Sequence, residues 1–278
     1  MDEPGSVPHR QFIYRHTIPV RVAHWVNVLC LLVLLMSGLQ IFNAHPTLYF
    51  GETSEPERAV LSLDAVERAD GSYAGITRIG SAEFDTTGVL GLSRDFDGSY
   101  SALGFPQWIT LPSYRDLATG RRWHFFFAWL FVLNGLTYLA YGTLAGHFRR
   151  DLAPSGSEVR HIGRSLWDHL RLRFPHGDEA RSYNVLQKLA YLAVIFGILP
   201  LVVLTGLTMS PAMDAAFPIL LDIFGGRQSA RTIHFLCATA LVLFVFVHVF
   251  MVLVSGAWNN MRSMITGRYG IDAKEQVR

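Results

Sequence analysis

Four long apolar stretches dominate the chain. They cover residues 22–42, 123–146, 189–213 and 232–256, and each runs for more than twenty residues without an Asp, Glu, Lys or Arg. An α-helix needs about 20 mostly apolar residues to cross the hydrocarbon core of a bilayer. The pattern therefore predicts a membrane protein with four spanning helices.

The chain is expected to form a single all-α membrane domain over residues 1–278. Its core is a four-helix bundle, with helices at about 20–42, 122–146, 187–210 and 231–257. The second connection, residues 147–186, is basic and contains an amphipathic stretch around 165–174 that we expect to lie on the membrane surface.

The first connection is unusually long. It forms an insertion over residues 43–120, although helices in bundles are usually joined by short loops. The insertion is rich in Gly, Ser and Asp, and its candidate strands are the short apolar runs Ile76–Ile79 and Val89–Leu92. An aromatic segment ending at Trp108 and Ile109 is expected to rest at the outer membrane interface.

The distribution of positive charge orients the helices. With the N-terminus in the cytoplasm, the inner segments 1–21, 147–188 and 257–278 carry 15 of the 24 Lys and Arg residues. Cytoplasmic loops carry such an excess, so we expect both termini inside and the insertion outside. The same bias accounts for the Arg-rich second connection, and nucleic-acid binding is not supported.

Four histidines lie within the apolar stretches, namely His24, His124, His234 and His248. An ionisable side chain inside a span is costly and marks a functional site by default. His234 and His248 are fourteen residues apart, which places them on one helix face and about 21 Å apart along the helix. The topology puts His24 and His248 in the inner half and His124 and His234 in the outer half.

This pairing matches the needs of haem iron with two imidazole ligands, which come from different helices and face each other. We predict that His24 and His248 ligate the iron of an inner haem b, and that His124 and His234 ligate the iron of an outer one. The alternative is that neutral histidines hydrogen-bond to neighbouring helices. The third span carries no histidine and is expected to pack without ligating iron.

Glycines on the histidine-bearing helices fit the same picture. Gly38 follows His24 by fourteen residues, while Gly135 and Gly142 follow His124 by eleven and eighteen. All three lie near the histidine face, where a macrocycle pressed against the helix needs a position without a side chain. Glycine is also common wherever membrane helices pack closely, so this second interpretation stays open.

Arginines flank the histidines at the ends of the spans. Arg121, Arg122 and Arg231 stand just outside the outer pair, and Arg21 stands just inside His24. Guanidinium groups at these positions are candidates to pair with haem propionates. Each is equally typical of an interface anchor whose charged end reaches the water.

Other chemistries have little support in the sequence. Cys30 and Cys237 both lie in spans, and there is no Cys-x-x-Cys-His motif for covalent haem attachment and no cysteine cluster for iron–sulfur ligation. The chain also lacks a nucleotide-binding loop and a nucleophile or acid–base cluster. We therefore expect no catalytic residues and no independent enzyme activity.

Several motifs resemble a known family. Arg21-Val-Ala-His24-Trp25-Val-Asn27, with the paired His234 and His248, resembles the bacterial di-haem cytochrome b family, which includes cytochrome b-561 and the cytochrome b subunits of Ni/Fe-hydrogenase and formate dehydrogenase. Gly120-Arg-Arg-Trp-His124-Phe and Leu204-Thr-Gly206-Leu are similar to its thiosulfate-reductase-like branch. The resemblance covers residues 10–42 and 115–268.

The resemblance implies a di-haem subunit of the bacterial inner membrane. Such a subunit passes electrons between membrane quinone or quinol and a periplasmic partner, a molybdopterin oxidoreductase or a hydrogenase. In relatives the quinone site adjoins the inner haem, which makes Asn27, Asn259 and Asn260 candidate quinone contacts. The insertion 43–120 is longer than the usual first connection of the family and leaves the partner's identity open.

Two other functions remain open on the sequence alone. The first is a transporter or channel that holds no haem and uses the histidines as a proton or metal relay. The second is a self-contained oxidoreductase that acts on quinone or an external metal ion without a partner. Haem content separates the first from a cytochrome, and turnover by the isolated chain separates the second.

Overall fold

The computed structural model describes residues 10–171 and 184–272. The chain forms two compact units. One, here called the terminal unit, comprises residues 1–25, 134–198 and 241–278. The other, here called the insertion unit, comprises residues 26–133 and 199–240 and contains the long first connection.

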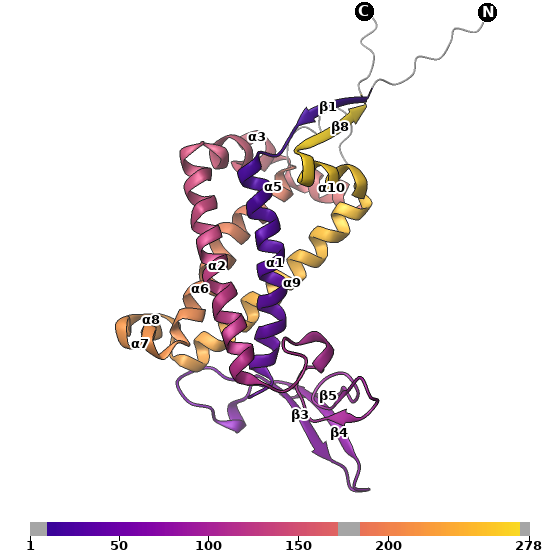
Figure 1. Ribbon diagram of the computed structural model, residues 1–278, viewed down its shortest axis with the longest axis vertical. Helices are drawn as coiled ribbons and strands as arrows, with labels where there is room; N and C mark the ends of the chain where they lie inside the picture. Colours follow the sequence, from indigo (N-terminus) through magenta and orange to yellow (C-terminus); the bar gives the residue numbers. More distant parts are fainter. Residues whose placement is uncertain (1–9, 172–183, 273–278) are drawn as a thin grey trace, which may run out of the picture. The chain divides into compact units, whose positions relative to one another are not determined.

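Four helices among the described residues are long and apolar enough to cross a membrane. They are α1 (Ile18–Phe42), α2 (Leu117–Leu144), a third run over Val185–Thr208, and α9 (Arg227–Val254) (Figure 1). Pro19 lies in the first turn of α1, where its missing N–H costs no hydrogen bond. The prediction of an all-α membrane protein with four spanning helices is confirmed.

The third spanning helix changes its winding half-way. It consists of α5 (Val185–Ala193), a π-helical turn η5 (Val194–Ile198) and α6 (Leu199–Thr208). Pro200 follows the π-helical turn directly. Proline lacks an N–H and its ring crowds the carbonyl four residues earlier. One widened turn before the proline accommodates both effects.

In the terminal unit, the two ends of the described chain pair with each other. Strands β1 (Arg10–Tyr14) and β8 (Arg268–Asp272) form an antiparallel ladder (Figure 1). Helix α10 (Ala257–Thr266) leads into β8 through Gly267, whose φ of +82° suits glycine. A Cβ atom at Gly267 would lie 2.5 Å from the Tyr14 ring, so the turn also needs the missing side chain.

The second connection begins with three short helical segments, η3 (Phe148–Leu152), α3 (Gly156–Arg160) and α4 (Ile162–Leu170). Ser155 and Glu158 form a capping box at the start of α3, and Lys188 of α5 donates to the Glu158 carboxylate at 2.9 Å. The expected amphipathic stretch 165–174 starts within α4, and residues 172–174 lie outside the described residues.

In the insertion unit, α1 and α2 pack through buried apolar side chains. The centre of this contact is formed by Cys30, Val33, Phe127 and Phe131. Two short helices, α7 (Pro211–Ala216) and α8 (Ile219–Phe224), connect α6 to α9. Both cysteines are buried and unpaired, as expected of small apolar side chains.

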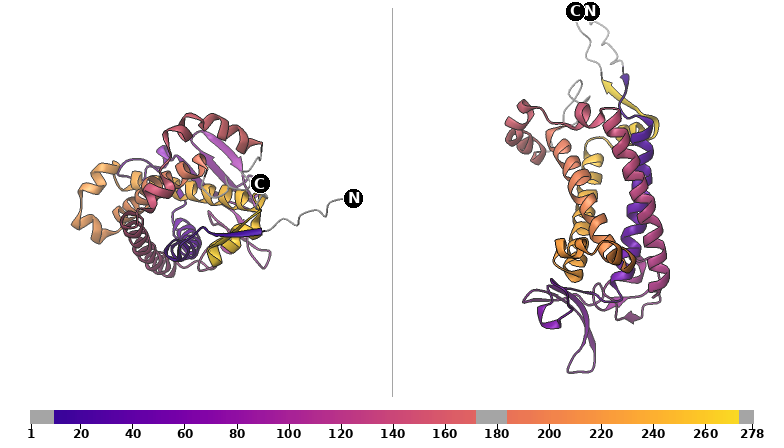
Figure 2. Two further views of the ribbon diagram at one scale, coloured as in Figure 1. Left: turned by 90° about the horizontal axis from the view of Figure 1, so that it is seen from above. Right: turned by 90° about the vertical axis from the view of Figure 1, so that its left-hand side faces the viewer.

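The insertion folds as a small β-structure. Its main sheet has the order β2-β3-β4-β5, and all neighbouring strands are antiparallel. The strands are β2 (Thr47–Leu48), β3 (Leu61–Glu67), β4 (Tyr73–Ile79) and β5 (Ala82–Asp85), with β3 and β4 as the long hairpin in Figure 2. The smaller elements are η1 (Pro56–Arg58), η2 (Gln107–Ile109), and a two-stranded ladder of β6 (Ser93–Arg94) and β7 (Tyr100–Ser101).

One of the two strand predictions is right and one is wrong. Ile76–Ile79 is part of β4, whereas Val89–Leu92 is a turn rather than a strand. The reason lies in the flanking Gly88 and Gly91, whose φ values of +87° and +75° turn the chain. A Cβ at Gly91 would also lie 2.5 Å from the Asp64 carbonyl oxygen, so the turn packs directly against β3.

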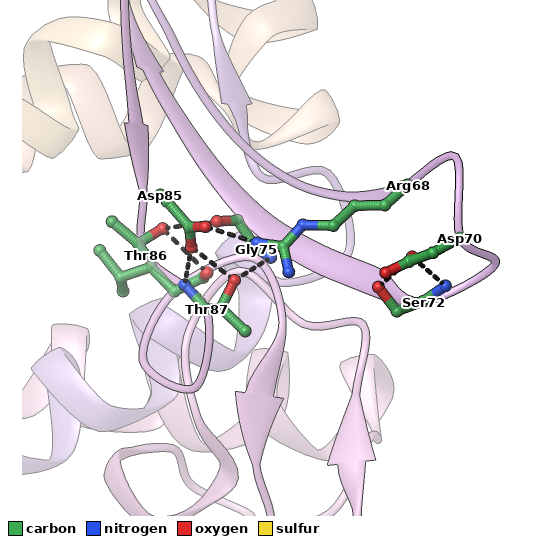
Figure 3. A network of polar contacts seen from close by, with 8 residues as sticks. Arg68, Asp70, Ser72, Gly75, Asp85, Thr86 and Thr87 are labelled. Carbon is green, nitrogen blue, oxygen red and sulfur yellow. Dashed lines mark hydrogen bonds and ion pairs between the residues drawn. The ribbon is translucent and has the colours of Figure 1, made fainter.

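Polar contacts between side chain and backbone fix the hairpin ends. Asp70 accepts from the backbone N–H and the hydroxyl of Ser72, and Asp85 does the same for Thr87 (Figure 3). Arg68 reaches across to the Asp85 carboxylate at 2.6 Å (Figure 3). These bonds hold the pKa values of Asp70 and Asp85 below their ordinary range, with the hydroxyl donors as the largest cause.

The insertion is anchored to the ends of α1 and α9 within its own unit. The Asn43 side chain donates to the Phe105 carbonyl at 2.9 Å and accepts from the Phe105 N–H at 2.7 Å. Arg231 of α9 donates to the carbonyls of His45 and Thr47. These contacts tie the loop backbone to the helices on which the histidines lie.

Candidate functional site

The four histidines of the spans come together in two pairs. The ring centroids of His24 and His248 are 6.3 Å apart, and those of His124 and His234 are also 6.3 Å apart. The angles between the ring planes are 62° and 61°. An iron atom bonded at about 2 Å to one nitrogen of each ring would separate the ring centres by about 6 Å. Both pairs therefore have the spacing that a bis-imidazole iron centre requires.

The hydroxyl of Ser37 on α1 orients the His124 ring. It donates to the Val33 carbonyl at 2.6 Å, and its oxygen lies 3.1 Å from Nδ1 of His124. Because the hydroxyl hydrogen is used on Val33, the oxygen accepts the Nδ1–H of His124. Nε2 is then left without a proton, which is the form of imidazole that binds iron.

The same device orients the His234 ring from α6. Nδ1 of His234 lies 2.9 Å from the Val202 carbonyl oxygen and 3.3 Å from Oγ1 of Thr205. A carbonyl oxygen only accepts, so Nδ1 carries the proton and Nε2 again is bare. We expected the third span to pack without ligating iron. In the structure this span also orients the ring of His234, which lies on α9.

Glycine next to each hydroxyl lets the ring approach the helix. A Cβ at Gly38 would lie 3.3 Å from Cε1 of His124, and a Cβ at Gly206 would lie 3.2 Å from Cε1 of His234. These distances are shorter than ordinary van der Waals contact, so a side chain would push the ring away. Gly38 was expected to make room for a macrocycle, and in the structure it makes room for the imidazole.

Ser37, Thr205 and Gly206 were not among the residues expected at the site. A signal for them exists, since Ser37-Gly38-Leu39 and Thr205-Gly206-Leu207 repeat one pattern. The partner helices also share a pattern, with Arg, two residues, His and Phe at 121–125 and at 231–235. Taken together, the two repeats match each helix that carries a Ser/Thr-Gly-Leu segment with a helix that carries a histidine.

Aromatic rings surround the other pair. Trp25 packs edge-on to His24 with centroids 5.3 Å apart, and its indole N–H donates to the Met264 carbonyl at 3.1 Å. Phe244 stacks on His248 at 5.9 Å, and the Tyr191 ring lies 6.5 Å away. These aromatic contacts hold the imidazole rings of His24 and His248 in an apolar environment. Such an environment shields a redox centre from water.

The other two glycines differ from each other. No atom lies within 4 Å of a Cβ built at Gly135, so space is open beside this position. At Gly142 such a Cβ would lie 2.3 Å from the Phe148 ring. Gly142 thus makes room for a side chain of the protein, and this contact alone explains the glycine there.

Two of the four arginines donate hydrogen bonds to backbone carbonyls of the protein. Arg21 donates to the Ile265 carbonyl at the end of α10, and Arg231 binds the loop carbonyls described above. Both contacts account for the positions of these side chains without a propionate. Arg121 and Arg122 are exposed on the first turns of α2, and the Arg121 guanidinium lies 5.8 Å from the Phe125 ring.

Two of the candidate quinone contacts serve the fold. The Asn259 side chain donates to the Gly270 carbonyl and accepts from its N–H, which pins β8 to α10. The Asn260 side chain donates to the Ser255 hydroxyl at 2.9 Å. Within residues 10–171 and 184–272, no group of three His, Cys, Asp or Glu side chains is arranged to hold a metal ion. The four histidines of the spans are instead arranged as two pairs.

Residues 15–267, nearly the whole chain, match the model of the prokaryotic cytochrome b561 family. The chain belongs to this family. Prokaryotic cytochromes b561 are membrane electron-transfer subunits that bind b-type haem, and the residues of both histidine pairs fit such a group in spacing and donor chemistry.

A similar protein supports the same assignment. The chain is 30% identical over 233 residues to the putative protein-methionine-sulfoxide reductase subunit YedZ1 of Azospira oryzae, covering 84% of this chain and 87% of the relative. No solved structure matches the chain. This cytochrome b561 is therefore a multi-pass membrane protein.

Proposed function

We propose that this cytochrome b561 holds two haems b and carries electrons between membrane quinol and a periplasmic oxidoreductase. The observation that carries the proposal is the presence of two histidine pairs with one spacing, 6.3 Å between ring centroids. When bound, haem iron supplies one-electron redox chemistry. The chain supplies the ligands, and Ser37, Thr205 and Val202 hold one pair in the tautomer that binds iron.

The direction of the proposed electron transfer follows from topology and the relative. The positive charge of the segments at 147–188 and 257–278 favours a cytoplasmic location for both termini, in the inner membrane of a bacterium. His24 and His248 then form the inner centre, next to quinol, and His124 and His234 form the outer one. The relative is named as part of a reductase, which favours electron flow outward to a periplasmic reductase.

The partner is proposed to dock at the outer face, where the insertion 43–120 lies in this topology. A molybdopterin enzyme fits a reductase of the kind named for the relative, with a hydrogenase as the other class that the sequence motifs suggest. Arg121 and Arg122 are the proposed propionate partners, because both are exposed on α2 near His124. Gly135, with open space beside it, is proposed to leave room for a macrocycle.

Haem stoichiometry tests the proposal. The purified full chain is expected to contain about two haems b, with a reversible reduced-minus-oxidised spectrum. His234→Ala and His248→Ala should each lose about half of the haem, since each removes one ligand of one pair. His161→Ala is the matched control, because this histidine is exposed and its Nδ1–H donates to the Ser157 carbonyl in the adjacent helical turn.

The outcomes separate the proposal from its alternatives. A chain that expresses well in haem-supplied cells and holds no haem would refute it and favour a histidine-lined transporter. Turnover of quinol with an external acceptor in the absence of any partner would identify a self-contained oxidoreductase. Equal haem content in wild type and both ligand variants would show that the histidine pairs are not the ligands.

A further inference from the structure

A buried histidine outside the two pairs has no role in the function proposed above. His147 follows α2 and is 8% exposed. A buried polar side chain is informative wherever it occurs, because burial costs free energy unless the group is hydrogen-bonded or paired. His147 lies in the terminal unit, together with His24 and His248.

Two glycines fold the chain so that His147 is buried. Gly146 adopts a φ of +67° and ends α2 in a tight turn. The following segment then folds back against α2, and the Phe148 ring occupies the place where a side chain at position 142 would be. A side chain at position 142 would therefore displace the Phe148 ring, and the positive φ at position 146 favours glycine.

Asp151 holds the His147 ring in one orientation. Nδ1 of His147 and Oδ2 of Asp151 are 2.7 Å apart across one turn of η3. The carboxylate accepts the Nδ1 proton, which leaves Nε2 of His147 as a basic nitrogen. The Asp151 side chain is 37% exposed, so the pair joins a buried imidazole to water. A base oriented by a carboxylate is the usual arrangement of a general acid–base group.

The groups that face this pair come from three segments. Tyr138 and Tyr141 of α2 place their rings 6.2 Å from that of His147, and Arg150 of η3 lies 3.5 Å from the Asp151 carboxylate. The Tyr141 hydroxyl is hydrogen-bonded to Thr17 at 2.8 Å, directly before α1.

The third segment brings His16, which is buried at 8% exposure and precedes α1, the helix of His24. The pKa of His16 is lowered to about 4, first by burial and then by the charges of Arg15, His24, His147 and Arg21. His16 therefore stays neutral at the pH of a cell. It lies within electrostatic reach of both His24 and His147 without holding a proton itself.

We propose that His147, oriented by Asp151, is the proton-exchange site for quinol oxidation at the His24–His248 centre. The proposal rests on the function proposed above. Quinol oxidation breaks two O–H bonds and releases two electrons and two protons. The electrons reduce ferric iron to ferrous iron, one per iron. The protons pass in turn to Nε2 of His147, where the Asp151 carboxylate stabilises the imidazolium until the proton leaves to water.

The experiment compares quinol with a reductant that delivers electrons without protons. The full chain in membranes is reduced by decyl-ubiquinol or by dithionite, and haem reduction is followed between pH 6 and 9. His147→Gln and Asp151→Asn should slow reduction by decyl-ubiquinol at least tenfold, while reduction by dithionite and the haem spectrum stay as in the wild type. His161→Gln is the matched control, since its Nδ1–H donates to the Ser157 carbonyl in a local contact but its ring is exposed.

An equilibrium readout accompanies the rates. Adding an electron near a protonatable pair favours its protonated form, so the midpoint potential of one haem should fall as the pH rises. The two variants should remove this pH dependence. The proposal is refuted if either the decyl-ubiquinol rate or the pH dependence stays as in the wild type. If His147→Gln loses haem, Asp151→Asn with an intact spectrum decides.

The failure of this inference can be told from that of the proposed function. A chain without haem, or one whose haem decyl-ubiquinol does not reduce, overturns both. A chain that holds two haems and is reduced by decyl-ubiquinol with equal rates in wild type and both variants overturns only the role of His147 and Asp151.

Discussion

Replacing Ser37 by alanine tests the link between helix packing and haem binding. The Ser37 side chain is fully buried, and its oxygen accepts the Nδ1–H of His124 at 3.1 Å. Alanine keeps the helix and the close approach of the ring at Gly38, because it only removes an atom. We therefore expect Ser37→Ala to change the orientation and the electronic properties of the His124 ring without a steric clash.

The magnitude follows from the lost acceptor. The Leu34 carbonyl is a second acceptor for the His124 ring, so the donor keeps one partner when the Ser37 hydroxyl is removed. Hydrogen bonds between membrane helices average about 0.6 kcal/mol and reach about 1.7 kcal/mol. A cost in this range corresponds to roughly 3- to 18-fold weaker haem binding.

Haem transfer from the purified protein to excess apomyoglobin measures this loss. One of the two haems should leave roughly 3- to 18-fold faster in Ser37→Ala, and the other should leave at the wild-type rate. Thr239→Ala is the matched control, because the Thr239 hydroxyl makes the same bond to its own helix at 2.9 Å but is exposed. Equal rates for Ser37→Ala and wild type would refute the reasoning that Ser37 holds His124.

Three further outcomes are expected. Gly206→Ala should weaken the binding of one haem, because its methyl group would lie 3.2 Å from the His234 ring and would displace that ring. A change in the midpoint potential of that haem would measure the displacement of its ligand. Gly135→Leu should leave the fold intact, because no atom of the described residues lies within 4 Å of a Cβ there, and it should displace the haem for which this space is proposed; unchanged haem content would contradict the clearance role. Asp85→Asn should lower the thermal stability of the insertion at pH 7, and this difference from the wild type should shrink as the pH falls below 3.8, because the bonds from Thr87 lower the pKa of Asp85 and their stabilising effect is lost as the pH falls through that lowered pKa. Limited proteolysis of the insertion at pH 7 and at a series of acidic pH values would measure this change.

The membrane helices were the most predictable part of the chain. Apolar runs without charge leave few alternatives in a bilayer, because the backbone must satisfy its own hydrogen bonds. The insertion was not predictable in the same way. Val89–Leu92 is as apolar as a strand, yet Gly88 and Gly91 with positive φ turn it, and that turn depends on packing against Asp64.

The histidine pairing followed from depth, since helices in a membrane have only two directions. Ser37, Thr205 and the Val202 carbonyl could not be found by that reasoning. Their contacts depend on how one helix is rotated against another, and single-helix periodicity carries no information about that rotation. His147 was missed for a related reason, because it lies beyond the end of α2 and is buried only by the turn at Gly146.

The arrangement around His124 and His234 divides one centre between neighbouring helices. Each of these histidines is held by the spanning helix that precedes its own, α1 for His124 and α6 for His234. Each consecutive pair of spanning helices thus supplies half of the centre, with its own hydroxyl, glycine and imidazole.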